Sequence, residues 1–206
     1  MNSDVSTLAD WIAESPSTVF FGGAGVSTES GIPDFRGANG FYFQEREIPL
    51  ETVLSIDFFE RHPQAYWEWF HEIYRPVEPN GAHRALASLE AAGRLDAVIT
   101  QNIDGLHQRA GSRAVWELHG NWERLVCTSC GAVASLGDSV RVDGDPVPTC
   151  PSCASQMRPD IVMYGESLDQ GVIEAAVSAI ARASTLIVAG TSLVVYPAAG
   201  LIDYFS

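Results

Sequence analysis

Short apolar runs alternate along the chain with segments of helical periodicity. The apolar runs lie at residues 18–21, 97–100, 114–118 and 186–190. Their length, and the polar residues or glycines around them, are typical of buried strands. Helices are predicted at 168–183 and between Asn80, a good N-cap, and Gly93, a good terminator. Strands that alternate with helices predict an α/β fold: a Rossmann-like parallel sheet with helices on both faces.

Three further segments complete the expected organisation. A short amphipathic helix around residues 8–12 is expected ahead of the first strand, and residues 161–164 are predicted as a strand. Aromatic and aliphatic residues are dense over 57–74, which predicts a buried helical module in which Pro63 marks a break or a helix start.

Composition limits the function classes. The chain has 206 residues, 46% of them hydrophobic, and a formal charge of −14 with no lysine. This charge argues against nucleic acid or an anionic membrane as partner, and the missing lysine excludes a lysine Schiff base or a P-loop lysine. The acidity favours basic partners, or it serves solubility alone. Without a signal peptide or a membrane span, we expect a cytoplasmic protein, and we expect a monomer.

A glycine-rich turn follows the first predicted strand. Glycines at such a turn let the backbone approach a phosphate closely. Gly23 and Gly25 fit the first two positions of the dinucleotide-binding pattern G-x-G-x-x-G, but Thr28 stands where the third glycine belongs. The glycines alone therefore fit an ordinary tight turn equally well.

Four cysteines form two C-x-x-C pairs. They are Cys127, Cys130, Cys150 and Cys153. Two such pairs supply a complete tetrahedral zinc site, which predicts a structural ion; disulfides and a redox motif fit a cytoplasmic chain poorly. We expect a zinc-binding module at 122–158 and a Rossmann-like domain at 1–121 and 159–206, with the helical module at about 38–78.

Polar residues follow two of the predicted strands. Asn102 and Asp104 lie in the loop after the strand at 97–100, and His119 follows the strand at 114–118. The carboxyl ends of parallel strands face one crevice, and a histidine has the pKa of a general base near neutral pH. Strand capping and turn formation explain these residues equally well from their chemistry alone.

Several motifs occur together in one order. They lie at residues 22–37, 101–104, 119–120, 158–166 and 190–193, with the C-x-x-C pairs between the third and the fourth. Over residues 5–203 the chain resembles the sirtuins, the NAD-dependent protein deacylases. The resemblance implies NAD and zinc as cofactors and acetyl-lysine proteins or peptides as substrates.

The resemblance also implies roles for individual residues. NAD contacts are implied for Ala24, Gly25, Thr28, Phe35, Arg36, Gln101, Asn102, Ile103, Asp104, His119, Thr191 and Ser192. Asn102, Asp104 and His119 would be catalytic, with His119 as general base on a ribose hydroxyl. The acyl oxygen of lysine would attack the ribose as nicotinamide leaves, and O-acetyl-ADP-ribose would be released. The peptide would lie beside Val162, Tyr164 and Gly165 as an added strand.

The resemblance leaves some functional choices open. Sirtuins that remove acidic acyl groups carry a Tyr-x-x-Arg pair, and the matching positions hold Phe70 and Ile73, so acetyl or another uncharged group is expected. Alternatives are mono-ADP-ribosyl transfer and a catalytically impaired NAD- and zinc-binding module. Sirtuins usually continue for tens of residues beyond the position of Ser206, so weakened NAD affinity is expected.

Overall fold

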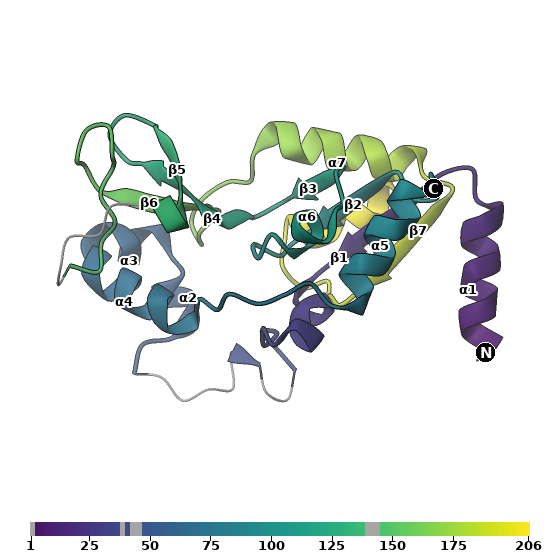
Figure 1. The fold of residues 1–206 in the computed structure, drawn as a ribbon, viewed down its shortest axis with the longest axis horizontal. Helices are drawn as coiled ribbons and strands as arrows, with labels where there is room; N and C mark the ends of the chain where they lie inside the picture. Colours follow the sequence, from purple (N-terminus) through teal and green to yellow (C-terminus); the bar gives the residue numbers. More distant parts are fainter. Residues whose placement is uncertain (1–2, 38–39, 42–46, 139–144) are drawn as a thin grey trace.

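The computed structural model describes residues 3–37, 40–41, 47–138 and 145–206. Two units lie side by side along the long axis of the molecule (Figure 1). The larger unit contains a parallel sheet with the strand order β3-β2-β1-β7. Its strands are β1 (Thr18–Gly22), β2 (Ala97–Thr100), β3 (Val115–Glu117) and β7 (Thr185–Ala189). These bounds confirm the four apolar runs as strands, because an all-parallel sheet is buried on both faces and needs continuous apolar sequence.

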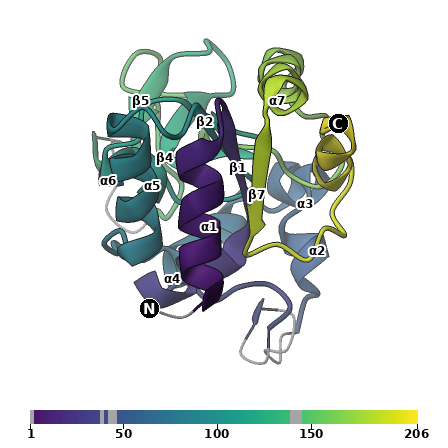
Figure 2. The same cartoon turned by 90° about the vertical axis from the view of Figure 1, so that its right-hand side faces the viewer.

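Helices cover both faces of this sheet (Figure 2). On one face lie α5 (Gly81–Ala91) and α6 (Leu106–Ala110), and on the other lie α7 (Gln170–Arg182) and the 3₁₀ helix η4 (Ala198–Tyr204). Successive strand residues point to opposite faces. Phe20 packs with Leu86 of α5, whereas its neighbour Phe21 packs with Ile180 of α7. The Rossmann-like prediction is therefore confirmed.

The smaller unit combines helices with an antiparallel sheet. Its helices are α2 (Leu50–Val53), α3 (Ile56–Arg61) and α4 (Pro63–Ile73). Its sheet has the order β5-β4-β6, with β4 (Gly120–Cys127), β5 (Val133–Ser135), β6 (Met157–Ile161) and the 3₁₀ turn η3 (Leu136–Asp138). Tyr66, Trp67 and Phe70 are fully buried against it. Pro63 is confirmed as a helix start. Parts of the predicted modules, residues 38–39, 42–46 and 139–144, lie outside the described residues.

The predicted strand at 161–164 is wrong. Strand β6 ends at Ile161, and the chain then turns away from the sheet. The Tyr164 N–H donates to the Leu54 carbonyl over 2.9 Å, and the Tyr164 carbonyl accepts from the Ile56 N–H over 3.0 Å. This short segment thus pairs with the helical module, a long-range contact that apolar sequence alone does not reveal.

The first helix differs from expectation in its packing. Helix α1 (Ser3–Glu14) forms, but Trp11 is 61% exposed and only Ile12 is buried. The glycine-rich turn leads into a 3₁₀ helix, η1 (Ala24–Ser30). Among the described residues, every helix is too short or too polar to cross a lipid bilayer.

Candidate active site

Four loops meet at the carboxyl edge of the parallel sheet. They follow β1, β2, β3 and β7, and they carry nearly all the residues expected from the sequence to bind a cofactor. In the strand order, β2 and β3 lie on one side of β1 and β7 lies on the other. The order therefore reverses beside β1, and ligands of open α/β sheets bind at such a switch point.

The turn after β1 packs closely on the turn after β7. The Gly25 N–H donates to the Gly190 carbonyl over 2.8 Å. A Cβ on Gly23 would lie 2.8 Å from the same carbonyl oxygen, and a Cβ on Gly190 would lie 2.4 Å from the Val26 nitrogen. Gly190 also has a φ of +64°, which side-chain-bearing residues rarely adopt. These glycines are required first by the close contact between the two turns.

A buried hydrogen-bond network joins the turns after β1 and β2. The Ser27 hydroxyl donates to Asp104 Oδ2 over 2.6 Å and accepts from Asn102 Nδ2 over 3.1 Å. Asn102 Nδ2 also lies 3.1 Å from the Gly23 carbonyl. Ser27 is 1% exposed, and it is not among the site residues predicted from the sequence. Its position within the glycine-rich motif was the signal that could have identified it.

Asp104 also has a local structural role. Its Oδ1 accepts from the Leu106 N–H over 3.0 Å at the start of α6. The turn-forming interpretation is therefore correct as well, because one carboxylate both closes a local turn before α6 and joins the network of Ser27. A carboxylate has about four lone-pair sites, so these two bonds leave acceptor capacity for a ligand.

His119 lies in the loop that follows β3, at the same edge of the sheet. Its Nδ1 is 2.8 Å from the Gln101 carbonyl oxygen. A carbonyl can only accept, so Nδ1 carries the proton and Nε2 keeps its lone pair. Burial lowers the pKa of His119, against the opposing effect of the Gln101 hydrogen bond, and this keeps the ring neutral at pH 7. Its geometry and charge state are those of a general base.

Two more contacts extend the site. Gln101 Nε2 donates to the Thr191 hydroxyl over 2.9 Å, which connects the loops after β2 and β7. The Val162 N–H donates to the His119 carbonyl over 2.9 Å, which holds the start of the predicted peptide-binding segment beside the histidine. The structure therefore brings together residues that are far apart in the sequence.

The other expected site residues lie around this network. Thr28, Phe35, Arg36, Tyr164, Gly165 and Ser192 are exposed, and Ala24, Ile103 and Val162 are half-buried. The Thr28 hydroxyl donates to the Gly25 carbonyl over 3.0 Å. The Phe35 ring lies 5.8 Å from the ring of Phe41. The exposed residues among them are therefore accessible to a ligand.

The four cysteines converge in the small unit. Their sulfur atoms all lie within 4.8 Å of one another, with separations of 3.5 Å between Cys127 and Cys153 and 3.7 Å between Cys130 and Cys150. A disulfide requires about 2.05 Å. Tetrahedral zinc with Zn–S bonds of about 2.3 Å holds its sulfurs about 3.8 Å apart. N–H groups of Cys130 and Ser129 lower the pKa of the Cys127 thiol, which favours the ligating thiolate. The four cysteines therefore form a candidate zinc site.

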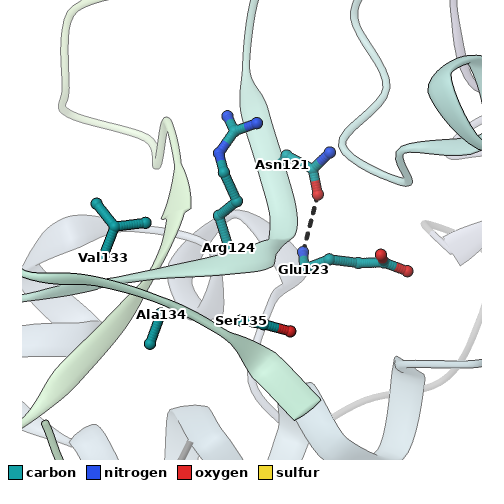
Figure 3. Close-up of a pocket in the computed structure, with 6 residues that line it drawn as sticks. All are labelled: Asn121, Glu123, Arg124, Val133, Ala134 and Ser135. Carbon is teal, nitrogen blue, oxygen red and sulfur yellow. Dashed lines mark hydrogen bonds between the residues drawn. The ribbon is translucent and has the colours of Figure 1, made fainter. Parts of the chain in front are cut away.

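Two open cavities lie outside the crevice. One of about 380 Å³ is on the small sheet and is lined by Asn121, Glu123, Arg124, Val133, Ala134 and Ser135 (Figure 3). All six belong to β4 or β5, and none is an expected site residue. A second, of about 550 Å³, lies between that sheet and α7 and includes Val162. The converging polar groups are at the sheet edge, so we locate the candidate site there.

Known proteins are similar to this chain in sequence and in fold. The Sir2 family profile matches residues 23–197. An NAD-dependent protein deacetylase of Clostridium acetobutylicum is 49% identical, covering 98% of this chain and 83% of its own length. One from Thermotoga maritima is 47% identical, covering 93% and 78%. A solved complex of Sir2, p53 peptide and NAD⁺ has a TM-score of 0.85 and 45% identity, covering 97% and 81%. The chain belongs to the Sir2 family.

Proposed function

We propose that this chain is an NAD-dependent protein-lysine deacetylase that transfers the acetyl group to ADP-ribose and releases nicotinamide. The observation that carries this proposal is His119, a neutral base oriented by the Gln101 carbonyl at the edge of the crevice. The relatives at 47–49% identity are named for this activity. A module that only binds a nucleotide has no need for a general base in this position.

The crevice has the features that an NAD site needs. The phosphates would lie beside Ala24, Gly25, Thr191 and Ser192, where glycines allow close approach of a ligand to the backbone, and the guanidinium of Arg36 would supply positive charge. Asn102, Ile103 and Asp104 would form the nicotinamide pocket, with Asp104 holding the carboxamide. Thr28 would border the phosphates and ribose, and Phe35 would shield the reacting face. When bound, NAD supplies the ribose carbon that accepts the acyl oxygen. Ser27 orients Asn102 and Asp104 for this role.

His119 would accept a proton from a ribose hydroxyl through Nε2. Nδ1 keeps its proton and donates it in a hydrogen bond to the Gln101 carbonyl, so the ring stays in the tautomer with a lone pair on Nε2. The lowered pKa keeps the base unprotonated near neutral pH but limits its proton affinity. The orientation of the ring is thus as important as its basicity.

The small unit would serve the peptide. Val162, Tyr164 and Gly165 would contact the acetyl-lysine segment through the main chain, which tolerates many sequences. Cys127, Cys130, Cys150 and Cys153 would bind a structural zinc, because four protein ligands close the coordination sphere. The domain bounds remain proposals: 122–158 for the zinc module, and 1–121 with 159–206 for the Rossmann-like domain, into which the helical module at about 38–78 is inserted. A cytoplasmic location, a monomeric state and the lack of nucleic-acid or membrane partners remain predictions.

The experiment is mass spectrometry of an acetyl-lysine peptide incubated with the zinc-loaded protein and NAD. We expect equimolar deacetylated peptide, nicotinamide and O-acetyl-ADP-ribose. His119→Ala should lower turnover about 10³-fold, within the range for loss of a general base. His62→Ala removes an exposed histidine at a helix junction and should leave turnover unchanged.

The outcomes separate the reaction from its base. No products from the folded, zinc-loaded wild-type protein would refute the deacetylase proposal. Full turnover by His119→Ala would refute the role of this residue alone. ADP-ribosylated protein formed without acetyl-lysine would instead support mono-ADP-ribosyl transfer.

A further inference from the structure

The segment between β6 and α7 lies outside any regular strand, yet it carries the three residues proposed to contact the peptide. Residues 162–165 start beside His119 and pass along the helical module. A peptide that binds by main-chain pairing requires a partner backbone of fixed shape. The structure must therefore fix this segment by other means.

Arg158 and Glu166 enclose the segment with a bidentate ion pair. Arg158 Nη1 donates to Glu166 Oε1, and Arg158 Nη2 donates to Glu166 Oε2, both over 2.6 Å. The side chains are 21% and 25% exposed. Paired guanidinium–carboxylate bonds fix geometry better than a single contact, and partial burial reduces their screening by solvent.

Glu166 also bonds to the segment itself, and Arg158 bonds to the residue immediately before it. Arg158 Nη2 donates to the Ile161 carbonyl over 2.9 Å, and Glu166 Oε2 accepts from the Met163 N–H over 2.9 Å. The Glu166 N–H closes a turn onto the Met163 carbonyl over 3.0 Å. Gly165 adopts a φ of +96° within this turn. The pair thus determines the backbone path directly.

The pair is supported from the helical module. The Arg158 guanidinium lies 5.9 Å from the centre of the Phe59 ring of α3. Burial by itself would raise the pKa of Glu166. Hydrogen bonds from Arg158 and the Met163 amide outweigh this effect and lower the pKa overall, so the carboxylate stays charged at neutral pH. Hydrogen bonding to Glu166 likewise raises the pKa of Arg158.

We propose that Arg158 and Glu166 are positioning residues that hold residues 162–165 in the conformation that receives the acyl-lysine peptide. They act on peptide affinity and not on NAD affinity, because their contacts are to the peptide-binding segment and not to the glycine turns. This inference rests on the proposed deacetylase function.

The test is steady-state kinetics of the zinc-loaded Glu166→Gln variant with an acetyl-lysine peptide and NAD. Glutamine keeps the side-chain size but removes the charge and one acceptor oxygen. We expect the peptide KM to rise about tenfold, on the scale of one lost charge-assisted hydrogen bond, while the NAD KM and kcat stay within about twofold. Arg158→Lys keeps the charge without the bidentate geometry, and its peptide KM should rise by a smaller factor.

Asp160→Asn is the matched control. Asp160 is on the same strand and forms an ion pair with Arg124, 2.9 Å away, without a hydrogen bond to residues 162–165 in the described parts of the chain. Its two KM values should equal those of the wild type. A peptide KM for Glu166→Gln within twofold of wild type, or an equal rise in the NAD KM, would overturn the inference. If Glu166→Gln fails to fold, an unchanged peptide KM for Arg158→Lys would overturn it.

Amide exchange separates this inference from the proposed function. In Glu166→Gln the Met163 and Tyr164 amides should exchange faster than in the wild type, and in Asp160→Asn they should not. Equal exchange in all three proteins would overturn the positioning role. A lack of deacetylase activity in the wild-type protein would overturn the proposed function. In that case, faster amide exchange in Glu166→Gln would still show that the ion pair orders residues 162–165.

Discussion

The two units of this protein are stabilised in different ways. The parallel sheet is covered by helices on both faces, and its core is mainly aliphatic and aromatic, with a few buried polar side chains such as His83 and His107. The small unit has a three-stranded sheet whose core includes Cys127 and Cys150, both 3% exposed. Apolar burial stabilises both units, and the small unit adds a candidate metal site formed by its four cysteines.

The comparison also separates the chemistry from the substrate. The proposed base His119 and the buried network of Ser27 lie on loops of the large unit, and the segment at 162–165 is held by the small one. A backbone bond from the Val162 N–H to the His119 carbonyl joins the two sets of residues. Changes in each unit should therefore have distinct effects on stability and catalysis.

Zinc removal should have the largest effect. Structural zinc binding provides about 10–16 kcal/mol of apparent free energy in small modules, so chelation should unfold the small unit selectively. Amides of β4 and β6 should lose exchange protection while those of β1 and β2 keep it. Cys150→Ser should reproduce this result, and Ser152→Ala, two residues away, should not. Equal loss of protection in both units would show that they unfold as one.

Truncation in the parallel core should reverse that pattern. Phe21 of β1 is completely buried against α7. Phe21→Ala should therefore lower the free energy of unfolding by about 3–5 kcal/mol. Denaturant titration of the zinc-loaded protein would measure this change. Tyr196→Ala is the control, since that side chain is 72% exposed and should change stability by less than about 0.5 kcal/mol. A small effect of Phe21→Ala would contradict the importance of this core.

Acid should destabilise the large unit through a buried histidine pair. The rings of His83 and His107 lie 4.7 Å apart, and neither ring nitrogen of His107 has a hydrogen-bond partner among the described residues. Burial, and secondarily His83, lowers the pKa of His107 to about 3. The unfolded histidine titrates near 6.5, so stability is complete above that pH and falls as the pH drops toward 3.

The expected slope from His107 is up to about 1.4 kcal/mol per pH unit. Urea titrations between pH 7.5 and 5 would measure it. His107→Leu should reduce the slope, because an apolar side chain there cannot be protonated. An unchanged slope in this variant would assign the acid sensitivity to other groups.

A specificity change should be the smallest effect in free energy. Ile73 is half-buried at the end of α4, next to the aromatic core that contains Phe70. Ile73→Arg should raise kcat/KM for a succinyl-lysine peptide about tenfold, through a charge-assisted bond to the acyl carboxylate. Ile73→Met is the neutral control. No gain with arginine would contradict the assigned position of the acyl pocket.

Local sequence predicted most of the elements. Asn80 does cap α5, accepting from the N–H groups of Ala82 and His83, and helix and strand periodicity identified α7 and the parallel strands. The spacing of the cysteines predicted their convergence. The Sir2 family was likewise identified from its motifs and is confirmed. These features depend on residues that are close in the chain or on patterns that repeat within one element.

Tertiary structure decided the contacts between distant segments. Ser27 bonds to residues 75 and 77 positions away, and no local pattern specifies that contact. The segment after Ile161 leaves its sheet because the Arg158–Glu166 pair and residues 54–56 hold it elsewhere. The sequence by itself predicted which residues are candidates for the chemistry. Only the packed chain determined how they are oriented, because their hydrogen-bond partners are brought together by folding.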